Sequence, residues 1–284
     1  MPCTSRAIAI IGMHRSGTSA VARSIAALGV YLGNDFLDAQ PENPTGYWED
    51  TGIVERDDRV LKTLGLRWDD VALIERRSFT GWRMWRLRRD LIRYLRRNFT
   101  AHALWGFKDP RSIRLLPFWE RALHECDVDD AYLLAIRNPA SVAASLFARQ
   151  AMPVETAQRL WLVHIVPFLR DLAQKPLAVV DYDLLMQDPR TQLERIARKL
   201  ELPRADAAEI DRFSGEFLDA KLRHTLFTLD DIDVTTQVGR LTRDAYALLH
   251  DVAADRREAD DAFWLRWQEL ERSLHCAPSA LRSG

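Results

Sequence analysis

Two glycines, Gly12 and Gly17, enclose a short polar segment near the N-terminus. The residues with polar side chains in and directly after this segment are His14, Arg15, Ser16, Thr18 and Ser19. An apolar run at 7–11 precedes the segment, and a helical pattern follows it. Strand, glycine-bounded loop and helix form a phosphate cradle, because N–H groups of the loop and helix N-terminus point inward and the helix dipole favours an anion. The spacing therefore predicts an anion-binding loop.

The cation of this loop differs from that of a nucleoside-triphosphate loop. The spacing matches G-x-x-x-x-G-K-[ST], but Thr18 stands where that motif has its lysine. The positive charge comes instead from Arg15, two residues before the second glycine. A charge at the mouth of the loop suits one terminal phosphate-like group better than a polyphosphate.

A second candidate anion site follows the apolar run at 131–136, which is typical of a buried strand. Arg137 ends this run, and Asn138-Pro139 is a strong helix start. Ser145 comes eight residues after Arg137, about two turns into that helix. Ligands of open α/β sheets bind at the carboxyl ends of strands, where an arginine fork and a hydroxyl can hold a phosphate. The alternative is a structural ion pair with a packed serine.

Together the two segments resemble those of sulfotransferases that use 3′-phosphoadenosine 5′-phosphosulfate (PAPS). The first is similar to the family's 5′-phosphosulfate loop and the second to its 3′-phosphate segment. The segment Trp105–Arg111 is similar to the K-D-P block of protein-tyrosine and many bacterial sulfotransferases. The segment 219–224 has a weaker similarity to bacterial members. The resemblance implies that the 5′ end is held by Arg15, Ser16, Gly17, Thr18 and Ser19. It implies that Arg137 and Ser145 hold the 3′-phosphate.

The family resemblance also suggests catalytic groups. By resemblance to the K-D-P block, Lys108 is expected to stabilise the leaving bridge oxygen, and it is the one lysine directly after a predicted buried strand. His14 can add a hydrogen bond, or it is a packed loop histidine. Cytosolic steroid and phenol sulfotransferases have lysine in place of Arg15 and a histidine base after K-T-H. Here the block reads K-D-P, so that histidine does not carry over.

The general base is expected to be a carboxylate. Relatives with an acidic base place it some twenty to thirty residues after the cradle, where Glu42, Glu49 and Asp50 occur, and Asp109 is a fourth candidate. Glu42 fits that distance better. Glu49 follows two aromatic residues that can desolvate it and raise its pKa toward neutrality. Glu49 is narrowly preferred as the general base.

Composition bounds the class of protein. The 284 residues carry a net charge of −1, which argues against a general affinity for nucleic acid. The three cysteines, Cys3, Cys126 and Cys276, lack metal-ligand spacing, and no metal site is expected. The apolar stretch 160–169 is too short to span a bilayer. A soluble, cytoplasmic protein is expected.

Apolar runs and helical periodicity predict the order of elements. Strands are predicted at 7–12, 103–107, 131–136 and 177–182, and a loop at 33–53. Helices are predicted at 17–28, 80–98, 112–125, 139–149, 154–173 and 190–200, with further helices in 206–275. Buried strands that alternate with helices predict an α/β fold: a parallel sheet covered by helices on both faces, with a helical C-terminal region. We expect residues 1–205 to form a PAPS-binding core of P-loop-like sulfotransferase fold, and 206–284 to be a helical extension of the same domain.

The segment 76–97 is rich in arginine. Its apolar residues Met84, Leu87, Leu91 and Leu95 form one helical stripe. A basic helix with tryptophans can sit peripherally on an anionic membrane or bind an acidic glycan. An ordinary surface helix whose stripe packs on the sheet is the favoured interpretation.

Three classes of function remain open. The first is a PAPS-dependent sulfotransferase acting on a hydroxyl or amine of a small-molecule or glycan acceptor. The second is a P-loop kinase of a small molecule or nucleoside, with Asp181 after a strand as Mg²⁺ ligand, although Thr18 argues against it. The third is a non-enzymatic nucleotide-binding or membrane-surface module. The sulfotransferase is preferred because two phosphate-type segments and the K-D-P block occur together.

Overall fold

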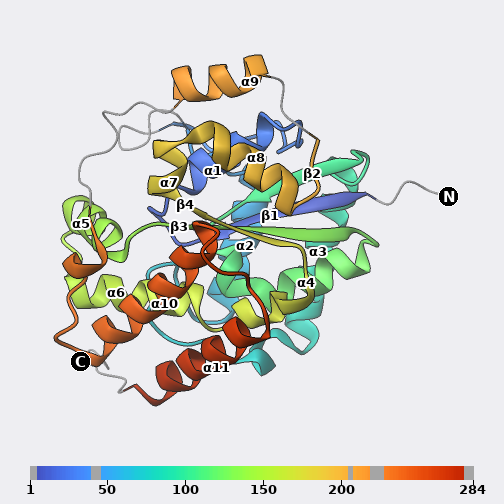
Figure 1. The fold of residues 1–284 in the computed structure, drawn as a ribbon. Helices are drawn as coiled ribbons and strands as arrows, with labels where there is room; N and C mark the ends of the chain where they lie inside the picture. Colours follow the sequence, from blue (N-terminus) through green and yellow to red (C-terminus); the bar gives the residue numbers. More distant parts are fainter. Residues whose placement is uncertain (1–4, 40–45, 204–206, 218–226, 278–284) are drawn as a thin grey trace.

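The computed structural model of the chain describes residues 5–39, 46–203, 207–217 and 227–277 (Figure 1). Its centre is a parallel sheet of four strands in the order β2-β1-β3-β4. The strands are β1 (Arg6–Gly12), β2 (Leu104–Lys108), β3 (Asp129–Ile136) and β4 (Leu177–Asp181). Ile8 of β1 pairs with Gly106 on one side and Ala131 on the other. All four strands begin and end within two residues of their predicted bounds.

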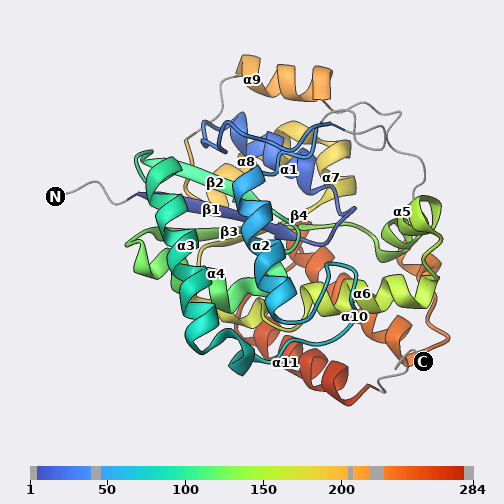
Figure 2. The ribbon, with the colours of Figure 1, turned by 180° about the vertical axis from the view of Figure 1, so that it is seen from behind.

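Helices cover both faces of this sheet, as Figures 1 and 2 show from opposite sides. One layer contains α1 (Thr18–Ala26), α7 (Tyr182–Gln187), α8 (Pro189–Lys199) and α9 (Ala207–Arg212). The other contains α2 (Thr51–Thr63), α3 (Trp82–Asn98), α4 (Leu116–Glu125), α6 (Val154–Ile165), α10 (Gln237–Ala253) and α11 (Asp261–Cys276). Helix α5 (Pro139–Gln150) lies beyond the carboxyl ends of the strands. The predicted fold class is confirmed.

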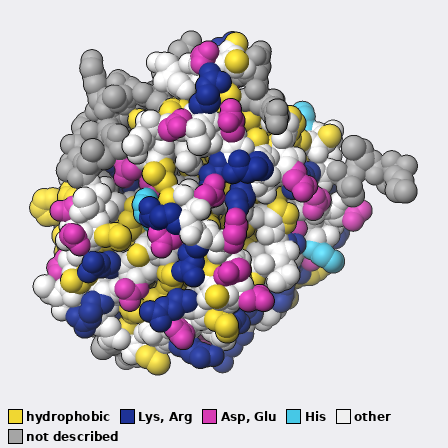
Figure 3. Space-filling model, viewed as in Figure 1, with side chains coloured by type: hydrophobic (Ala, Val, Ile, Leu, Met, Phe, Trp, Pro, Cys, Tyr) yellow, Lys and Arg dark blue, Asp and Glu magenta, His cyan; other side chains and the backbone are white. Residues whose placement is uncertain are grey.

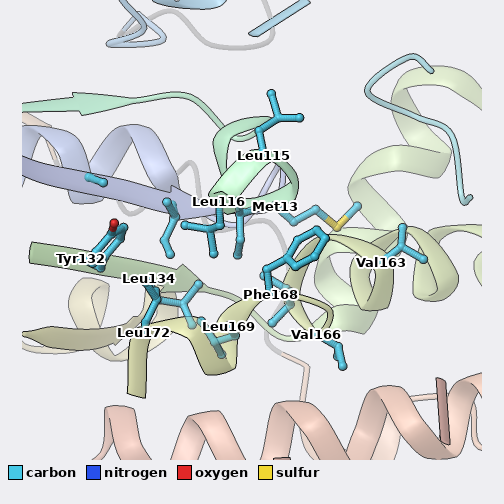
Figure 4. Close-up of a cluster of buried hydrophobic side chains, with 14 of the residues drawn as sticks. Met13, Leu115, Leu116, Tyr132, Leu134, Val163, Val166, Phe168, Leu169 and Leu172 are labelled. Atoms are coloured by element: carbon cyan, nitrogen blue, oxygen red, sulfur yellow. The ribbon is translucent and has the colours of Figure 1, made fainter. Parts of the chain in front are cut away.

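Successive side chains of β1 pack alternately against the two helical layers. Ala7, Ala9 and Ile11 belong to the core under α2–α6, whereas Ile8 and Ile10 belong to the core under α1 and α8. Because both faces are buried, the strands read as unbroken apolar runs. Figure 4 shows part of the larger core, where side chains of β3 meet those of α4 and of the segment 163–172. This packing fixes the strand ends that carry the polar residues of the site.

Three helical regions differ from prediction. The predicted loop 33–53 ends earlier than expected, because Asp50 caps α2 by accepting a hydrogen bond from the Ile53 N–H at 3.0 Å. The predicted helix 154–173 is interrupted, and a 3₁₀ helix, Leu169–Gln174, follows α6. Pro167 accounts for the break, since proline has no N–H to continue the helix. The region 112–125 likewise begins with a 3₁₀ turn, Ser112–Leu115, before α4.

The short elements and the C-terminal helices complete the chain. Among the described residues, a 3₁₀ helix, Arg76–Phe79, precedes α3, and a π-helical turn, Phe213–Phe217, and a 3₁₀ helix, Leu229–Asp231, come later. Helix α10 packs on α6 and β4, and α11 packs on α10. The predicted division at residues 205 and 206 stays a prediction. In the part of the chain that the structure describes, no helix combines the length and apolarity needed to cross a bilayer.

Candidate functional site

The loop between β1 and α1 has the backbone geometry of an anion cradle. Gly12 and Gly17 have φ values of 149° and 76°. A Cβ on Gly12 would lie 2.4 Å from the carbonyl oxygen of Ala135, and one on Gly17 would lie 2.1 Å from the Tyr182 ring. Both positions therefore require glycine. As the N-cap of α1, Gly17 offers no side chain to the first N–H groups of the helix, which leaves them suited to an anionic ligand.

Arg15 links the two segments that the sequence predicts as separate anion sites. Its Nε donates a hydrogen bond of 2.8 Å to Oγ of Ser145, on α5. The backbone of Arg15 is left-handed, with φ 68°, an uncommon conformation for a residue other than glycine. The structure thus brings the cradle and the second segment together at one edge of the sheet.

Arg137 follows β3 at the same edge. Its guanidinium carbon lies 4.6 Å from the centroid of the Tyr182 ring, the same ring that packs against Gly17. Arg137 Nε and Ser16 Oγ are both buried and have no hydrogen-bond partner among the described residues. Buried polar atoms without partners are uncommon, and at a strand-end cradle they fit a site for a polar ligand.

The end of β2 carries a buried ion pair. Lys108 Nζ donates to Glu49 Oε1 and also lies 3.0 Å from the carbonyl oxygen of Tyr47 and 3.5 Å from Ser19 Oγ on α1. The exposed fractions of Lys108 and Glu49 are 3% and 5%. Burial raises the pKa of Glu49, and the neighbouring ammonium group opposes that shift. A cation and a carboxylate therefore meet beside the cradle helix.

Arg111 supports this pair and is a site residue that was not predicted from the sequence. Its Nη1 lies 3.7 Å from Glu49 Oε2 and 2.9 Å from Asp109 Oδ1, and its Nε lies 2.7 Å from Asp58 Oδ1. The Arg111 N–H also donates to Asp109 Oδ1 at 2.9 Å. The one sequence signal was its place directly after the K-D-P block.

A further buried carboxyl group lies behind Arg111. Asp57 of α2 accepts hydrogen bonds from Ser112 Oγ at 2.8 Å and Trp119 Nε1 at 2.9 Å. Burial, and then the negative charge of Asp109, raise the pKa of Asp57 well above its ordinary value. Asp57 thus ties the middle of α2 to α4 and to the 3₁₀ turn that precedes it.

The other acidic candidates have different surroundings. Asp50 caps α2 and also accepts a hydrogen bond of 2.6 Å from Tyr94 Oη. Asp109 is fully buried and has one oxygen bound to Arg111. Glu42 lies outside the described residues, as does the segment 219–224. Among the candidates that the structure describes, Glu49 is the one that contacts the lysine beside the cradle.

The His14 ring contacts other rings. Its ring centroid lies 4.4 Å from that of Trp68 and 6.1 Å from that of His164. Burial, together with the positive charge of Arg111, lowers the pKa of His14 well below its ordinary value, so the ring is neutral at pH 7. Its Nε2 is buried and has no hydrogen-bond partner among the described residues.

Asp181, the candidate Mg²⁺ ligand of a kinase, has structural partners. One of its oxygens accepts from the N–H groups of Asp183 and Leu184, at 2.8 and 3.2 Å, and so caps α7. The other accepts from Tyr246 Oη at 2.9 Å. Within the described ranges, no group of three or more His, Cys, Asp and Glu side chains is placed to hold a metal ion.

No family model matches the sequence, and no curated protein matches it significantly. Solved structures similar to this one include two sulfotransferases. The sulfotransferase domain from the Synechococcus PCC 7002 olefin synthase has a TM-score of 0.47 and 15% identity, over 86% of this chain and 95% of that one. Sulfotransferase STF1 from Mycobacterium tuberculosis H37Rv has a TM-score of 0.43 and 17% identity, over 86% of this chain and 77% of that one. Both TM-scores lie below 0.5, and the function is inferred from the residues of this chain.

Proposed function

We propose that this chain is a sulfotransferase that uses PAPS as donor and transfers the sulfuryl group to a hydroxyl or amine of a small-molecule or glycan acceptor. One observation carries the proposal. A buried lysine–glutamate pair, Lys108 and Glu49, adjoins an anion cradle that lacks the lysine of a triphosphate loop. A cation for a leaving group and a carboxylate for an acceptor proton are the two groups that sulfuryl transfer needs.

The residues around the cradle fit a ligand with two anionic ends. Arg15, Ser16, Gly17, Thr18 and Ser19 would hold the 5′ end, and Arg137 with Ser145 would hold the 3′-phosphate. The buried, unpartnered Ser16 Oγ and Arg137 Nε support this assignment, because each has a hydrogen-bond donor to offer. The contact between Arg15 and Ser145 would keep the two ends of the site in register.

PAPS, when bound, supplies the sulfuryl group and a leaving phosphate oxygen on which negative charge grows. Lys108 would offset that charge, since a fixed cation in a site that excludes water acts strongly on a developing anion. Glu49 would accept the proton of the acceptor, a role to which its raised pKa is suited. The pair would have to separate for both roles, and Arg111, 3.7 Å from Glu49 Oε2, would then remain as the cation beside the carboxylate.

The kinase alternative receives less support from the same residues. Thr18 stands where the catalytic lysine of a triphosphate loop would be, and the two Asp181 oxygens serve the α7 cap and Tyr246.

Calorimetric titration tests the proposal. Adenosine 3′,5′-bisphosphate, which is the desulfonated donor, and ATP with Mg²⁺ are titrated separately into the wild type and into Arg137→Ala. The control variant is Arg190→Ala, which removes an exposed arginine of α8. We expect micromolar bisphosphate binding and weaker ATP binding. Loss of a charge-assisted contact in Arg137→Ala should weaken bisphosphate binding by about tenfold or more, and the exposed control should not. Tighter binding of ATP with Mg²⁺, or an unchanged affinity in Arg137→Ala, would reject it.

A further inference from the structure

Arginine is concentrated in one short part of this chain. The segment 76–97 contains nine arginines and one acidic residue, Asp90, although the whole chain has a net charge of −1. Most of these arginines lie on α3. The remainder of the chain is therefore acidic overall, and this helix is a basic surface on an otherwise acidic protein.

The exposed residues of α3 share one side of the helix. Met84, Leu91 and Leu95 are buried and face the core. At 3.6 residues per turn, the opposite side presents one continuous stripe. We call it the α3 stripe, and its members, all exposed, are Trp82, Trp85, Arg86, Arg89, Arg93, Arg96 and Arg97.

The two tryptophans of the α3 stripe are the unusual part of it. Their exposed fractions are 65% for Trp82 and 54% for Trp85. The guanidinium carbons of Arg83 and Arg86 lie 5.6 and 5.9 Å from the Trp82 ring, within cation–π distance. An indole ring in a basic setting has an apolar body and a polar N–H, which is the amphipathic character of residues at membrane–water interfaces.

The positive charge of the stripe is not neutralised by its neighbours. Asp90 is shared by Arg56 at 3.2 Å, Arg59 at 3.0 Å and Arg93 at 3.7 Å. Arg86, Arg89 and Arg97 have no ion pair in the part of the chain that the structure describes. By contrast, the face in Figure 3 shows basic and acidic side chains interspersed. Helix α3 lies on the other side of the molecule, as the turned view of Figure 2 shows.

We propose that the α3 stripe is a docking surface for an anionic lipid membrane. The arginines would bind lipid headgroups, and Trp82 and Trp85 would enter the headgroup region of the bilayer. Charge complementarity with anionic lipid, and two exposed indoles at one end of the helix, favour a broad lipid surface over a single ligand. The stripe is separate from the strand-end site, so this proposal is independent of the proposed activity.

Vesicle flotation of the full-length protein tests the docking surface. The vesicles contain phosphatidylcholine alone or with one third phosphatidylglycerol. We expect binding to the anionic vesicles only, and a fall in binding between 0.1 and 0.5 M salt, because exposed charges are screened. Arg86→Glu/Arg89→Glu should bind about tenfold more weakly or worse, because each basic residue near such a surface contributes to binding. The matched control Arg256→Glu/Arg266→Glu, which reverses two exposed arginines outside the stripe, should bind as the wild type does.

The tryptophans are tested in the same assay. Trp82→Ser/Trp85→Ser should also lose about tenfold in affinity, and it should lose the fluorescence quenching that brominated lipids cause. Leu265→Ser removes an equally exposed apolar side chain from α11 and should change nothing. Circular dichroism and bisphosphate titration verify that each variant is folded.

Three results would overturn the proposal. The first is an absence of binding to anionic vesicles. The second is equal binding by the stripe variants and their controls. The third is that heparin or a single-stranded oligonucleotide binds the stripe while anionic vesicles do not, which would assign the surface to a soluble polyanion.

Discussion

Two regions of this molecule use positive charge in opposite ways. At the strand ends, Lys108 and Arg111 are nearly buried, and each lies beside Glu49. On α3, Arg86 and Arg89 are exposed and have no ion pair among the described residues. The first region concentrates charge in a small volume of low dielectric constant, and the second spreads it over a long helix face.

The difference determines what each region can do. A buried charge interacts strongly at short range, and removing its partner leaves an uncompensated ion, so such pairs are sensitive to single substitutions. An exposed charge is screened by water and salt, and acts through the summed field of several residues. Single changes at the strand ends should therefore have large effects, whereas α3 should need several changes to lose its binding.

The largest effect is expected from Lys108→Ala. Removal of the cation should lower turnover by about a thousandfold while bisphosphate affinity changes little, because the lysine acts on charge that develops during transfer. The measurement is the release of adenosine 3′,5′-bisphosphate from PAPS, with calorimetry for binding. The double variant Lys108→Ala/Glu49→Gln removes both charges and separates loss of chemistry from misfolding. Unchanged turnover in folded Lys108→Ala would contradict the assigned role.

Glu49→Gln should have the next largest effect, a loss of about a hundredfold or more, because a general base contributes that much. Burial raises the pKa of Glu49, so the wild-type rate should fall as pH falls through a value above the ordinary carboxylate range. The glutamine cannot titrate, and its pH–rate profile should lose that limb. Normal turnover in Glu49→Gln would shift the role to Glu42, and normal turnover in Glu42→Gln as well would end the acidic-base hypothesis.

Arg111→Met removes a positive charge next to Glu49 without removing a reacting group. Without the nearby guanidinium the charged carboxylate is less favoured, so the acidic limb of the pH–rate profile should move up by about one pH unit. Arg111→Lys should restore part of the shift. Asp58→Asn, which removes the exposed acid beside Arg111, should leave the limb in place. A loss of rate with an unmoved limb would mean that Arg111 acts through packing alone.

The sheet could be predicted because its strands contain apolar runs, such as 131–136. An apolar run is a local signal that can be recognised without knowing which elements pack on it. Helix α2 was not predicted, because the turn-rich stretch before it obscures the start at Asp50 and Thr51-Gly52 is a weak helix opening. Its stripe of Ile53, Val60 and Leu61 was nevertheless a readable signal.

The site was harder to predict than the sheet. Sequence spacing could nominate Lys108, Glu49 and Arg137, because each lies in or near a motif. It could not indicate that Arg15 bonds Ser145, 130 residues away, or that Asp57 bonds Trp119, 62 residues away. Such contacts depend on how the layers pack on the sheet, and no local pattern in the sequence encodes them.

The smallest expected effects are changes in the free energy of unfolding when a contact of a buried or of an exposed charge is removed. Tyr246→Phe removes the hydrogen bond that the buried Asp181 accepts from α10, and should lower the free energy of unfolding by about 1.5 to 3 kcal/mol. Arg266→Ala removes an exposed partner of Glu269 and should change it by less than about 0.5 kcal/mol. Urea unfolding at low and high salt measures both. Equal losses of stability in the two variants would show that contacts of buried charges do not contribute more to stability than contacts of exposed charges in this protein.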